Sequence, residues 1–345
     1  MEAQQDILLQ VQNLKTYFSL LDGTVRAVDG ADLYVRRNKT LGVVGESGCG
    51  KSVMARSILR IVPNPGKIVE GTILYHRLAQ NRGSVTFETI DLTALKPNGN
   101  QIRNIRGAEI AMVFQEPMTS LSPVHTVGDQ ISEAVILHQE TSKAEARNRA
   151  IEMLSKVGMP QPARTVDQYP HQLSGGMRQR AMIAMALSCS PSLLIADEPT
   201  TALDVTTQAQ ITELMLEMQK QLGMSILYIT HDLGVIAETA DDVIVMYLGK
   251  VVEHTDVESL FHDPKHPYTR SLMRSIPRIG RKSRQRLESI KGVVPDPYSL
   301  PPGCPFHPRC PSFMEGVCDK ETPKYIEVSP NHLVRCHLYP QQGGN

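Results

Sequence analysis

The feature that most constrains this chain is a glycine-rich loop set between an apolar segment and a helical pattern. Its eight residues fill every fixed position of G-x-x-x-x-G-K-[ST] and are Gly45, Glu46, Ser47, Gly48, Cys49, Gly50, Lys51 and Ser52. The apolar run 40–44 before the loop predicts a short buried strand, and the apolar spacing over 53–62 predicts a helix that Pro63 ends. Strand, loop and helix in this order predict an α/β fold that binds a nucleoside triphosphate.

Each fixed position of this P-loop has a task at a triphosphate. The glycines let backbone N–H groups converge on the phosphates, and the following helix directs its positive end toward them. We expect Lys51 to bind the β- and γ-phosphates and Ser52 to place its hydroxyl on Mg²⁺. Cys49 occupies a variable position, where a small residue is tolerated.

Composition narrows the possible partners. The 345 residues include 36 basic and 36 acidic side chains, so no electrostatic footprint for nucleic acid is expected. No apolar run approaches the length of a membrane span, and the N-terminus lacks the pattern of a signal peptide. The sequence therefore predicts a cytoplasmic protein whose membrane role, if it has one, comes through a partner.

Apolar patterning outlines the rest of the chain. Further short strands are predicted at 7–11, 26–28, 31–35, 191–197, 225–230 and 243–247. We expect an antiparallel strand pair with a long loop in 76–100 and a mainly helical unit over 126–157. Proline and basic residues increase beyond about residue 262, which marks a boundary.

Two adjacent carboxylates, Asp197 and Glu198, end one of the predicted strands. Side chains at the carboxyl end of a parallel strand emerge at the edge where ligands bind. Asp197 is predicted to hold Mg²⁺, and Glu198 to polarise the attacking water as general base. Without the P-loop, a solvated acidic turn before Pro199 would be the simpler interpretation.

A second glycine motif, 173–177, reads Leu-Ser-Gly-Gly-Met. Together with the P-loop it resembles the ATP-binding cassette (ABC) ATPases, and the resemblance covers roughly 7–255 with the motifs in family order. It implies a face-to-face dimer in which Ser174, Gly175 and Gly176 bind the γ-phosphate of ATP seated on the partner's P-loop. A hydroxyl, two unobstructed amides and a helix N-terminus form an anion site, so hydrolysis removes a bridging charge and drives motion.

The same resemblance assigns the remaining site residues. Gln115 is expected to touch Mg²⁺ and the attacking water, because an amide binds both without titrating. His231 is expected to contact the γ-phosphate and orient the water, and Asp204, in the segment 202–204, to face the opposite subunit. Phe18, or its neighbour Tyr17, is expected to stack on adenine.

The length between the motifs separates branches of this family. DNA-repair relatives insert long coiled coils between P-loop and signature and ribosome-associated relatives carry two cassettes, whereas this chain has one compact cassette. A transporter subunit is therefore predicted, with a non-transport ABC ATPase as the alternative. Residues 106–123 and 266–272 closely resemble dipeptide/oligopeptide importer ATPases of bacteria and archaea, the OppD/DppD type. That resemblance implies that residues 116–130 dock on a coupling helix of a membrane subunit. The segment 77–88 is longer than the corresponding segment usually is in that family.

The resemblance also implies an architecture and a setting. We expect a P-loop NTPase cassette over 1–261, with a RecA-like α/β core, an antiparallel β subdomain and a helical subdomain at about 120–185, followed by an extension over 262–345. The expected activity is ATP hydrolysis that powers di- and oligopeptide uptake, as a translocase. Expected partners are a homologous second ATPase subunit in a heterodimer, two permease subunits and an extracytoplasmic solute-binding protein, at the cytoplasmic face of the membrane. Oligosaccharides, nickel and glutathione are alternative cargoes.

Four cysteines lie in the proline-rich tail: Cys304, Cys310, Cys318 and Cys336. A cytoplasmic location argues against disulfides, and four thiolates suggest one metal centre that staples a segment too small for its own core. Structural zinc more often uses paired C-x-x-C knuckles, which this chain lacks, so the irregular spacing favours a [4Fe-4S] cluster. The resemblance agrees; Zn²⁺ and unligated thiols are the alternatives.

Overall fold

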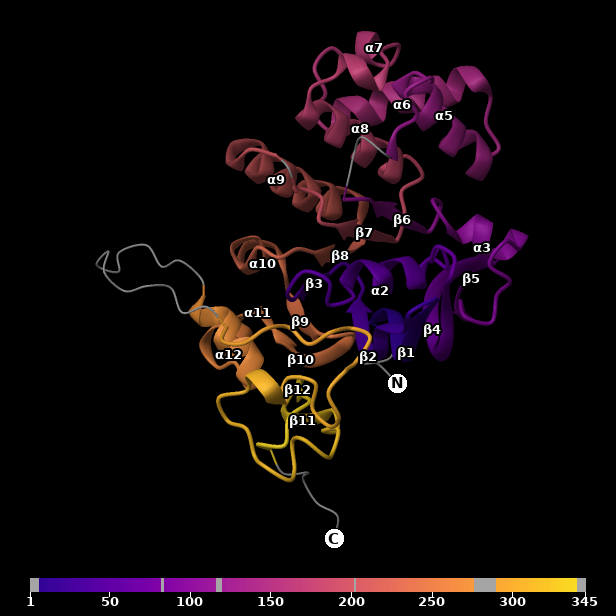
Figure 1. Ribbon diagram of the computed structural model, residues 1–345. Helices are drawn as coiled ribbons and strands as arrows, with labels where there is room; N and C mark the ends of the chain where they lie inside the picture. The colour runs from indigo at the N-terminus through magenta and orange to yellow at the C-terminus, as the bar shows by residue number, and fades with distance from the viewer. Residues whose placement is uncertain (1–5, 82–83, 116–119, 202, 276–289, 340–345) are drawn as a thin grey trace. The chain divides into compact units, whose positions relative to one another are not determined.

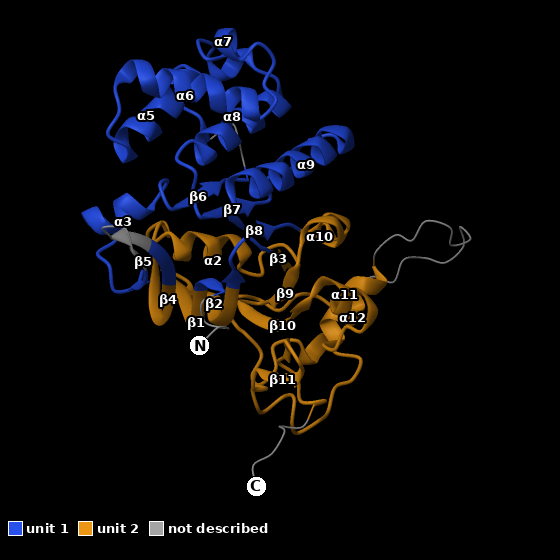
Figure 2. Ribbon diagram, turned by 180° about the vertical axis from the view of Figure 1, so that it is seen from behind, with its two compact units in different colours: residues 1–9, 35–40, 75–230 blue, residues 10–34, 41–74, 231–345 orange. Residues whose placement is uncertain are grey.

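The computed structural model describes residues 6–81, 84–115, 120–201, 203–275 and 290–339. The chain divides into two compact units, coloured separately in Figure 2. Unit 1 comprises residues 1–9, 35–40 and 75–230, and unit 2 comprises residues 10–34, 41–74 and 231–345. The chain crosses between the units several times, so each unit is built from segments distant in sequence.

The core of unit 2 is a mixed sheet in which strand β3 (Thr40–Val44) pairs in parallel with β9 (Asp242–Tyr247), Gly42 opposite Val243. Antiparallel β10 (Lys250–Asp256) follows β9, and β12 (His332–Val334) and β11 (Ile326–Ser329) extend the sheet (Figure 1). Every residue of β3 and β9 is buried, as expected of strands that are covered on both faces.

Four helices of unit 2 begin at capped or loop-defined positions. They are α2 (Lys51–Ile58), α10 (Leu233–Thr239), α11 (Val257–His262) and α12 (Pro267–Arg274), with a 3₁₀ turn η2 (His307–Arg309) in the tail. Asp232 and Asp256 cap α10 and α11 by accepting backbone N–H bonds, which satisfies first-turn donors. The P-loop therefore passes directly from a buried strand into a helix, as the sequence predicts.

Long strands form a second sheet. In unit 2, β2 (Gly23–Arg36), β1 (Ile7–Leu20) and β4 (Gly66–Asn81) are neighbours in that order. In unit 1, β4 continues beside β5 (Ser84–Asp91), where the Arg77 guanidinium pairs with the Glu88 carboxylate at 2.7 Å. The sequence predicts a strand pair in 76–100; β5 lies within that range, whereas β4 begins earlier, at Gly66, and the intervening residues 82–83 lie outside the described residues.

Unit 1 combines three parallel strands with helices. Strands β6 (Ile110–Val113), β7 (Leu193–Asp197) and β8 (Ser225–Ile229) are adjacent in that order. Its helices are α3 (Asn100–Ile105), α5 (Val127–His138), α6 (Lys143–Lys156), α7 (Pro162–Thr165), α8 (Gly175–Leu187) and α9 (Val205–Leu222), with a 3₁₀ turn η1 (Pro170–Gln172). Helices α5, α6 and α8 pack against one another. The helical pattern predicted over 126–157 is confirmed as α5 and α6.

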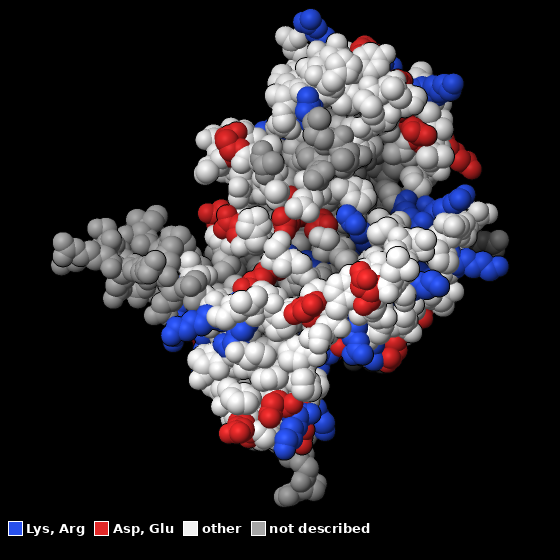
Figure 3. Space-filling model, in the orientation of Figure 1, with Lys and Arg blue, Asp and Glu red and all other residues white. Residues whose placement is uncertain are grey.

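The surface follows the balanced composition. Figure 3 shows basic and acidic side chains interspersed on the face drawn there. Among the residues that the structure describes, no helix combines the length and the apolar character needed to cross a bilayer.

Candidate functional site

The P-loop of unit 2 depends on two glycines that admit no side chain. A Cβ on Gly45 would lie 2.3 Å from the carbonyl oxygen of Met246. Gly50 has φ +102°, and its Cβ would lie 2.1 Å from the carbonyl oxygen of Ala27. Because left-handed backbone and close approach coincide at Gly50, only glycine suits this position.

Lys51 lies inside the loop that it terminates. Its side chain is buried, and Nζ donates to the carbonyl oxygens of Gly45 at 2.8 Å and Glu46 at 3.2 Å. Ser52 follows in the first turn of α2. The sequence therefore places a cation, a hydroxyl and a helix N-terminus at one point, the arrangement that P-loop proteins use for phosphates and Mg²⁺.

Glu46, at a variable position of the loop, has contacts that the sequence did not indicate. Its carboxylate accepts hydrogen bonds from Arg309 Nη1 at 2.7 Å and Nη2 at 3.0 Å. Its backbone N–H donates to the Tyr268 hydroxyl at 2.9 Å. Both partners belong to the C-terminal part of the chain, so no motif spacing could have found them.

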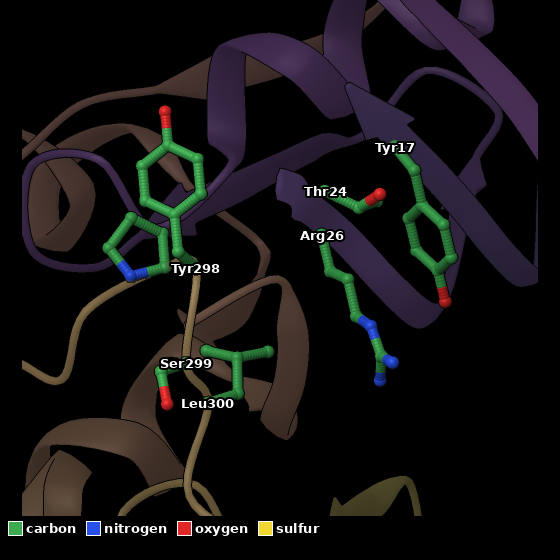
Figure 4. A pocket seen from close by; sticks show the side chains of 7 residues that line it. Tyr17, Thr24, Arg26, Tyr298, Ser299 and Leu300 are labelled. Carbon is green, nitrogen blue, oxygen red and sulfur yellow. The ribbon is translucent and has the colours of Figure 1, made fainter. Parts of the chain in front are cut away.

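A cavity of about 450 Å³ adjoins the hairpin of β1 and β2 (Figure 4). Its lining comes from two segments and comprises Tyr17, Thr24, Arg26, Pro297, Tyr298, Ser299 and Leu300. Arg26, which lines the cavity, directly precedes Ala27, whose carbonyl oxygen would lie 2.1 Å from a Cβ on Gly50 of the P-loop. Burial and a hydrogen bond to Asp29 raise the pKa of Tyr17 to about 12, so its hydroxyl stays protonated.

Phe18, expected from the sequence at the adenine, is not among the residues that line this cavity. Its ring faces Gly66, where a Cβ would lie 2.5 Å from a ring carbon. Consecutive residues of a strand point to opposite faces, so the two candidates cannot both line it. The structure therefore places Tyr17 at the cavity and Phe18 in packing against β4 and Val62.

The acidic pair of unit 1 lies where β7 ends. Asp197 is its buried last residue, and Glu198 follows with φ +47°, a left-handed conformation uncommon for a non-glycine residue. Glu198 Oε2 accepts hydrogen bonds from Gln115 Nε2 at 3.1 Å and from the Thr201 hydroxyl at 3.0 Å. The structure thus brings Gln115 and Glu198 together, and it adds Thr201, which sequence reasoning missed.

The signature motif forms the start of α8 in unit 1. Ser174 is its N-cap, with Oγ accepting the Met177 N–H at 3.3 Å, and both Ser174 and Gly175 are exposed. Nearby, Asp204 caps α9, and a Cβ on Gly176 would lie 3.0 Å from the Thr207 methyl group of that helix. The start of α8 and the segment around Asp204 therefore lie side by side.

His231 and the P-loop belong to unit 2, whereas the acidic pair and the signature belong to unit 1. His231 is exposed and directly precedes Asp232, the cap of α10. Of the segment 202–204, Ala202 lies outside the described residues, as do residues 116–119 of the predicted docking surface.

The four tail cysteines line one small cavity of about 10 Å³ in unit 2. All four are free thiols, and the Cys304 N–H donates to the Cys318 carbonyl oxygen at 2.8 Å. Burial, reinforced by the neighbouring thiols, raises the pKa of Cys304 to about 12 and that of Cys336 to about 11. Within the described ranges, no three His, Cys, Asp or Glu side chains are placed to hold a single metal ion.

A P-loop after a buried parallel strand, an acidic pair at the end of another and a glycine signature on a helix N-terminus define an ATP-hydrolysing cassette. Residues 28–201 match the family described as ABC transporter, and residues 252–318 match the oligopeptide/dipeptide transporter C-terminal region. The chain belongs to the ABC transporter ATP-binding proteins, in the group that carries this C-terminal region.

Relatives of similar length support this placement. The chain is 50% identical to the probable peptide ABC transporter ATP-binding protein y4tR of Sinorhizobium fredii, covering 96% of this chain and 95% of that protein. It is also 50% identical to the oligopeptide transport ATP-binding protein AppD of Bacillus subtilis, covering 97% and 98%. Identity to the dipeptide transport ATP-binding protein DppD of Bacillus subtilis is 48%, covering 97% and 96%.

A solved structure supports the fold as well. The dimeric ATP-binding cassette MJ0796, in a post-hydrolysis state bound to ADP and Pi, superimposes with a TM-score of 0.61 at 26% identity. The match covers 72% of this chain and 99% of that one. The ABC cassette fold is therefore established.

Proposed function

We propose that this ATPase powers the import of di- and oligopeptides. This proposal rests on sequence identities of 48% to 50%, over nearly the whole chain, to proteins named for peptide, oligopeptide and dipeptide transport. The matched C-terminal region supports it independently of the cassette. The ATP-binding subunit does not itself contact the cargo, so the assignment of peptides rests on these relatives.

The nucleotide site is proposed as follows. Lys51 and the P-loop amides bind the phosphates, while Ser52, Gln115 and Asp197 hold Mg²⁺ and its water. Glu198 is the general base, supported by its hydrogen bond from Gln115, and His231 contacts the γ-phosphate. Of the two aromatic candidates Phe18 and Tyr17, we favour Tyr17 as the residue that stacks on adenine, because it lines the cavity that adjoins the hairpin of β1 and β2.

Assembly follows from the exposed signature. Ser174, Gly175 and Gly176 would bind ATP held by a second, homologous ATPase subunit, with Asp204 facing that subunit. The exposed apolar side chain of Val124, at 72%, supports docking of the predicted surface 116–130 on a permease subunit. We further propose two permease subunits and an extracytoplasmic solute-binding protein as partners, at the cytoplasmic face of the membrane, with a cassette over 1–261 and an extension over 262–345.

The tail is proposed to hold a [4Fe-4S] cluster, with Zn²⁺ as the alternative. Four thiols around one cavity supply the donor set that such clusters require. A bound metal deprotonates its thiol ligands, which would offset the raised pKa values of Cys304 and Cys336. Cys304, Cys310, Cys318 and Cys336 would be the ligands, and the cluster would fix the tail.

The substitution Glu198→Gln tests the ATPase mechanism. We expect ATP turnover to fall by ~10²- to 10⁴-fold, the usual contribution of a general base. ATP binding should persist, and ATP should trap a dimer visible by light scattering. Glu152→Gln is the control, since Glu152 lies exposed on α6 in a pair with Lys156. Near-normal turnover in Glu198→Gln would exclude it as the base.

Cargo is tested with the complete transporter in proteoliposomes. Labelled tripeptide should enter only with ATP and should not enter with the Glu198→Gln subunit. Uptake of labelled nickel, oligosaccharide or glutathione in place of the tripeptide would replace the peptide assignment while leaving the ATPase intact.

A further inference from the structure

Arg309 is a buried cation whose contacts converge on the P-loop. Its side chain is 3% exposed, and its guanidinium forms a two-point contact with the Glu46 carboxylate, whose side chain is 26% exposed. Nη1 also donates to the Tyr247 hydroxyl at 3.3 Å, and Nε donates to the Lys291 carbonyl at 3.3 Å. The hydrogen bonds to Glu46 and, less strongly, to Tyr247 raise the pKa of Arg309 against the opposing effect of burial, so the group stays charged.

Glu46 is held at the main chain too. Its N–H donates to the hydroxyl of Tyr268, a fully buried residue of α12. Its carbonyl oxygen accepts from Lys51 Nζ at 3.2 Å and from the Cys49 N–H at 3.2 Å. Residues of the C-terminal part of the chain therefore hold the residue whose carbonyl oxygen accepts hydrogen bonds from Lys51 and Cys49.

The charge of Glu46 needs a partner at this position. The loop gathers phosphates, and an uncompensated carboxylate on its second residue would repel them. A buried, two-point Arg–carboxylate contact is strong and directional, and removing one partner leaves the other charge unpaired. Arg309 thus neutralises a negative charge inside an anion site.

The position of Arg309 is itself set by the tail. It ends the turn η2, which lies between Cys304 and Cys310. Phe306, just before this turn, is 1% exposed and packs on Tyr247 and on Tyr268, with ring centroids 5.2 Å and 5.3 Å apart. One aromatic cluster therefore carries both tail residues that contact Glu46.

We propose that Arg309 and Tyr268 are positioning residues of the nucleotide site: the C-terminal extension holds Glu46, neutralises it and so sets the affinity of the P-loop for ATP. This inference rests on the P-loop binding ATP as proposed above. Arg309 acts through Glu46 and does not itself touch the nucleotide.

The test is a charge-rescue cycle on the full chain, with the Kd of a fluorescent ATP analogue measured in the presence of Mg²⁺. Arg309→Met keeps similar volume and is expected to weaken binding by at least ~10-fold, because it exposes the phosphates to an unpaired carboxylate. Glu46→Gln removes the repelling charge together with the contact, so it should weaken binding by less than Arg309→Met does. The double variant should bind ATP more tightly than Arg309→Met, since the unpaired charge is gone.

The matched control is the pair of Arg335 and Asp32, at 3.1 Å, which joins the same tail to β2 rather than to the P-loop. Arg335→Met should lower the thermal midpoint yet leave the Kd within ~2-fold. If Arg309→Met proves insoluble, Arg309→Lys, which keeps the charge but loses the two-point geometry, is measured in the same cycle and should weaken binding by ~3-fold or more.

The outcomes separate the two proposals. An unchanged Kd in Arg309→Met, or a double variant as weak as Arg309→Met or weaker, overturns the positioning role. If the wild-type chain itself binds no ATP, the proposed nucleotide site fails instead.

Discussion

Acid should weaken the docking of the tail through a single histidine. His266 is 1% exposed and caps α12, with its Nδ1 accepting the Tyr268 N–H at 3.1 Å. Burial lowers the pKa of His266 from 6.5 to about 4. Because the folded pKa lies below the unfolded value, the stability contributed by the neutral ring is complete above pH 6.5. It is lost as the pH falls toward 4.

The loss of stability on acidification can be calculated from the pKa shift of His266. At roughly 1.4 kcal/mol per unit, the shift corresponds to about 3 kcal/mol in total, of which about 2 kcal/mol is lost between pH 7.5 and pH 5. Restricting the range to pH 5 and above separates this effect from that of Glu253. Burial acts to raise the pKa of Glu253, but hydrogen bonds from His332 and from backbone amides lower it below its ordinary 4.5.

Scanning calorimetry of the wild type and of His266→Asn at pH 7.5 and pH 5 isolates the stability that is lost when His266 is protonated. Asparagine is a good N-cap and does not titrate, so the cost of the smaller side chain is the same at both values. At roughly 2 °C per kcal/mol, the wild type should lose about 4 °C more than the variant on acidification. Equal losses, within 1 °C, would refute the reasoning.

Three further predictions concern the P-loop, the adenine-stacking residue and the cysteines of the tail. Gly50→Ala should abolish ATP binding, because its Cβ would lie 2.1 Å from the Ala27 carbonyl oxygen. Equilibrium binding of a fluorescent ATP analogue measures this effect, and retained binding would contradict the loop geometry. Tyr17→Ala should raise the Kd for ATP by ~10-fold through lost stacking, whereas Phe18→Ala should lower the thermal midpoint instead; the reverse pattern would restore Phe18 as the adenine residue. Anaerobically purified protein should contain iron and absorb near 400 nm, and Cys304→Ser should lose both; one equivalent of zinc without iron would replace the cluster by Zn²⁺.

The features that could be predicted from the sequence are those set by the backbone requirements of short segments. Gly45 and Gly50 occupy positions where only glycine fits, so the glycine pattern of the motif predicts the backbone conformation of the loop. The apolar strands β7, β8 and β9 were likewise predictable, because a strand buried on both faces requires an uninterrupted apolar run. These features depend on short segments and need no knowledge of distant contacts.

Contacts between distant segments explain what could not be predicted. Arg309 and Glu46 are 263 residues apart, and the loop pattern leaves position 46 free. The choice between Tyr17 and Phe18 depends on which face of β1 meets the cavity, and one residue of register reverses it. Short strands β11 and β12, in a tail without periodicity, form only because β10 offers an edge to pair with.

Left-handed backbone occurs in both segments that the proposed mechanism uses, the P-loop after β3 and the acidic pair at the end of β7. After β3 the left-handed conformation falls on glycine, where phosphates must approach the main chain and no side chain is needed. After β7 it falls on Glu198, where the proposed mechanism needs a carboxylate, so glycine cannot be used there to avoid the cost of about 1–3 kcal/mol. The Glu198 N–H bond to the Ile229 carbonyl and the carboxylate contacts with Gln115 and Thr201 hold that conformation. A glycine in a motif reveals its conformation in the sequence, whereas a strained glutamate does not, which is why the backbone geometry of Glu198 could not be predicted.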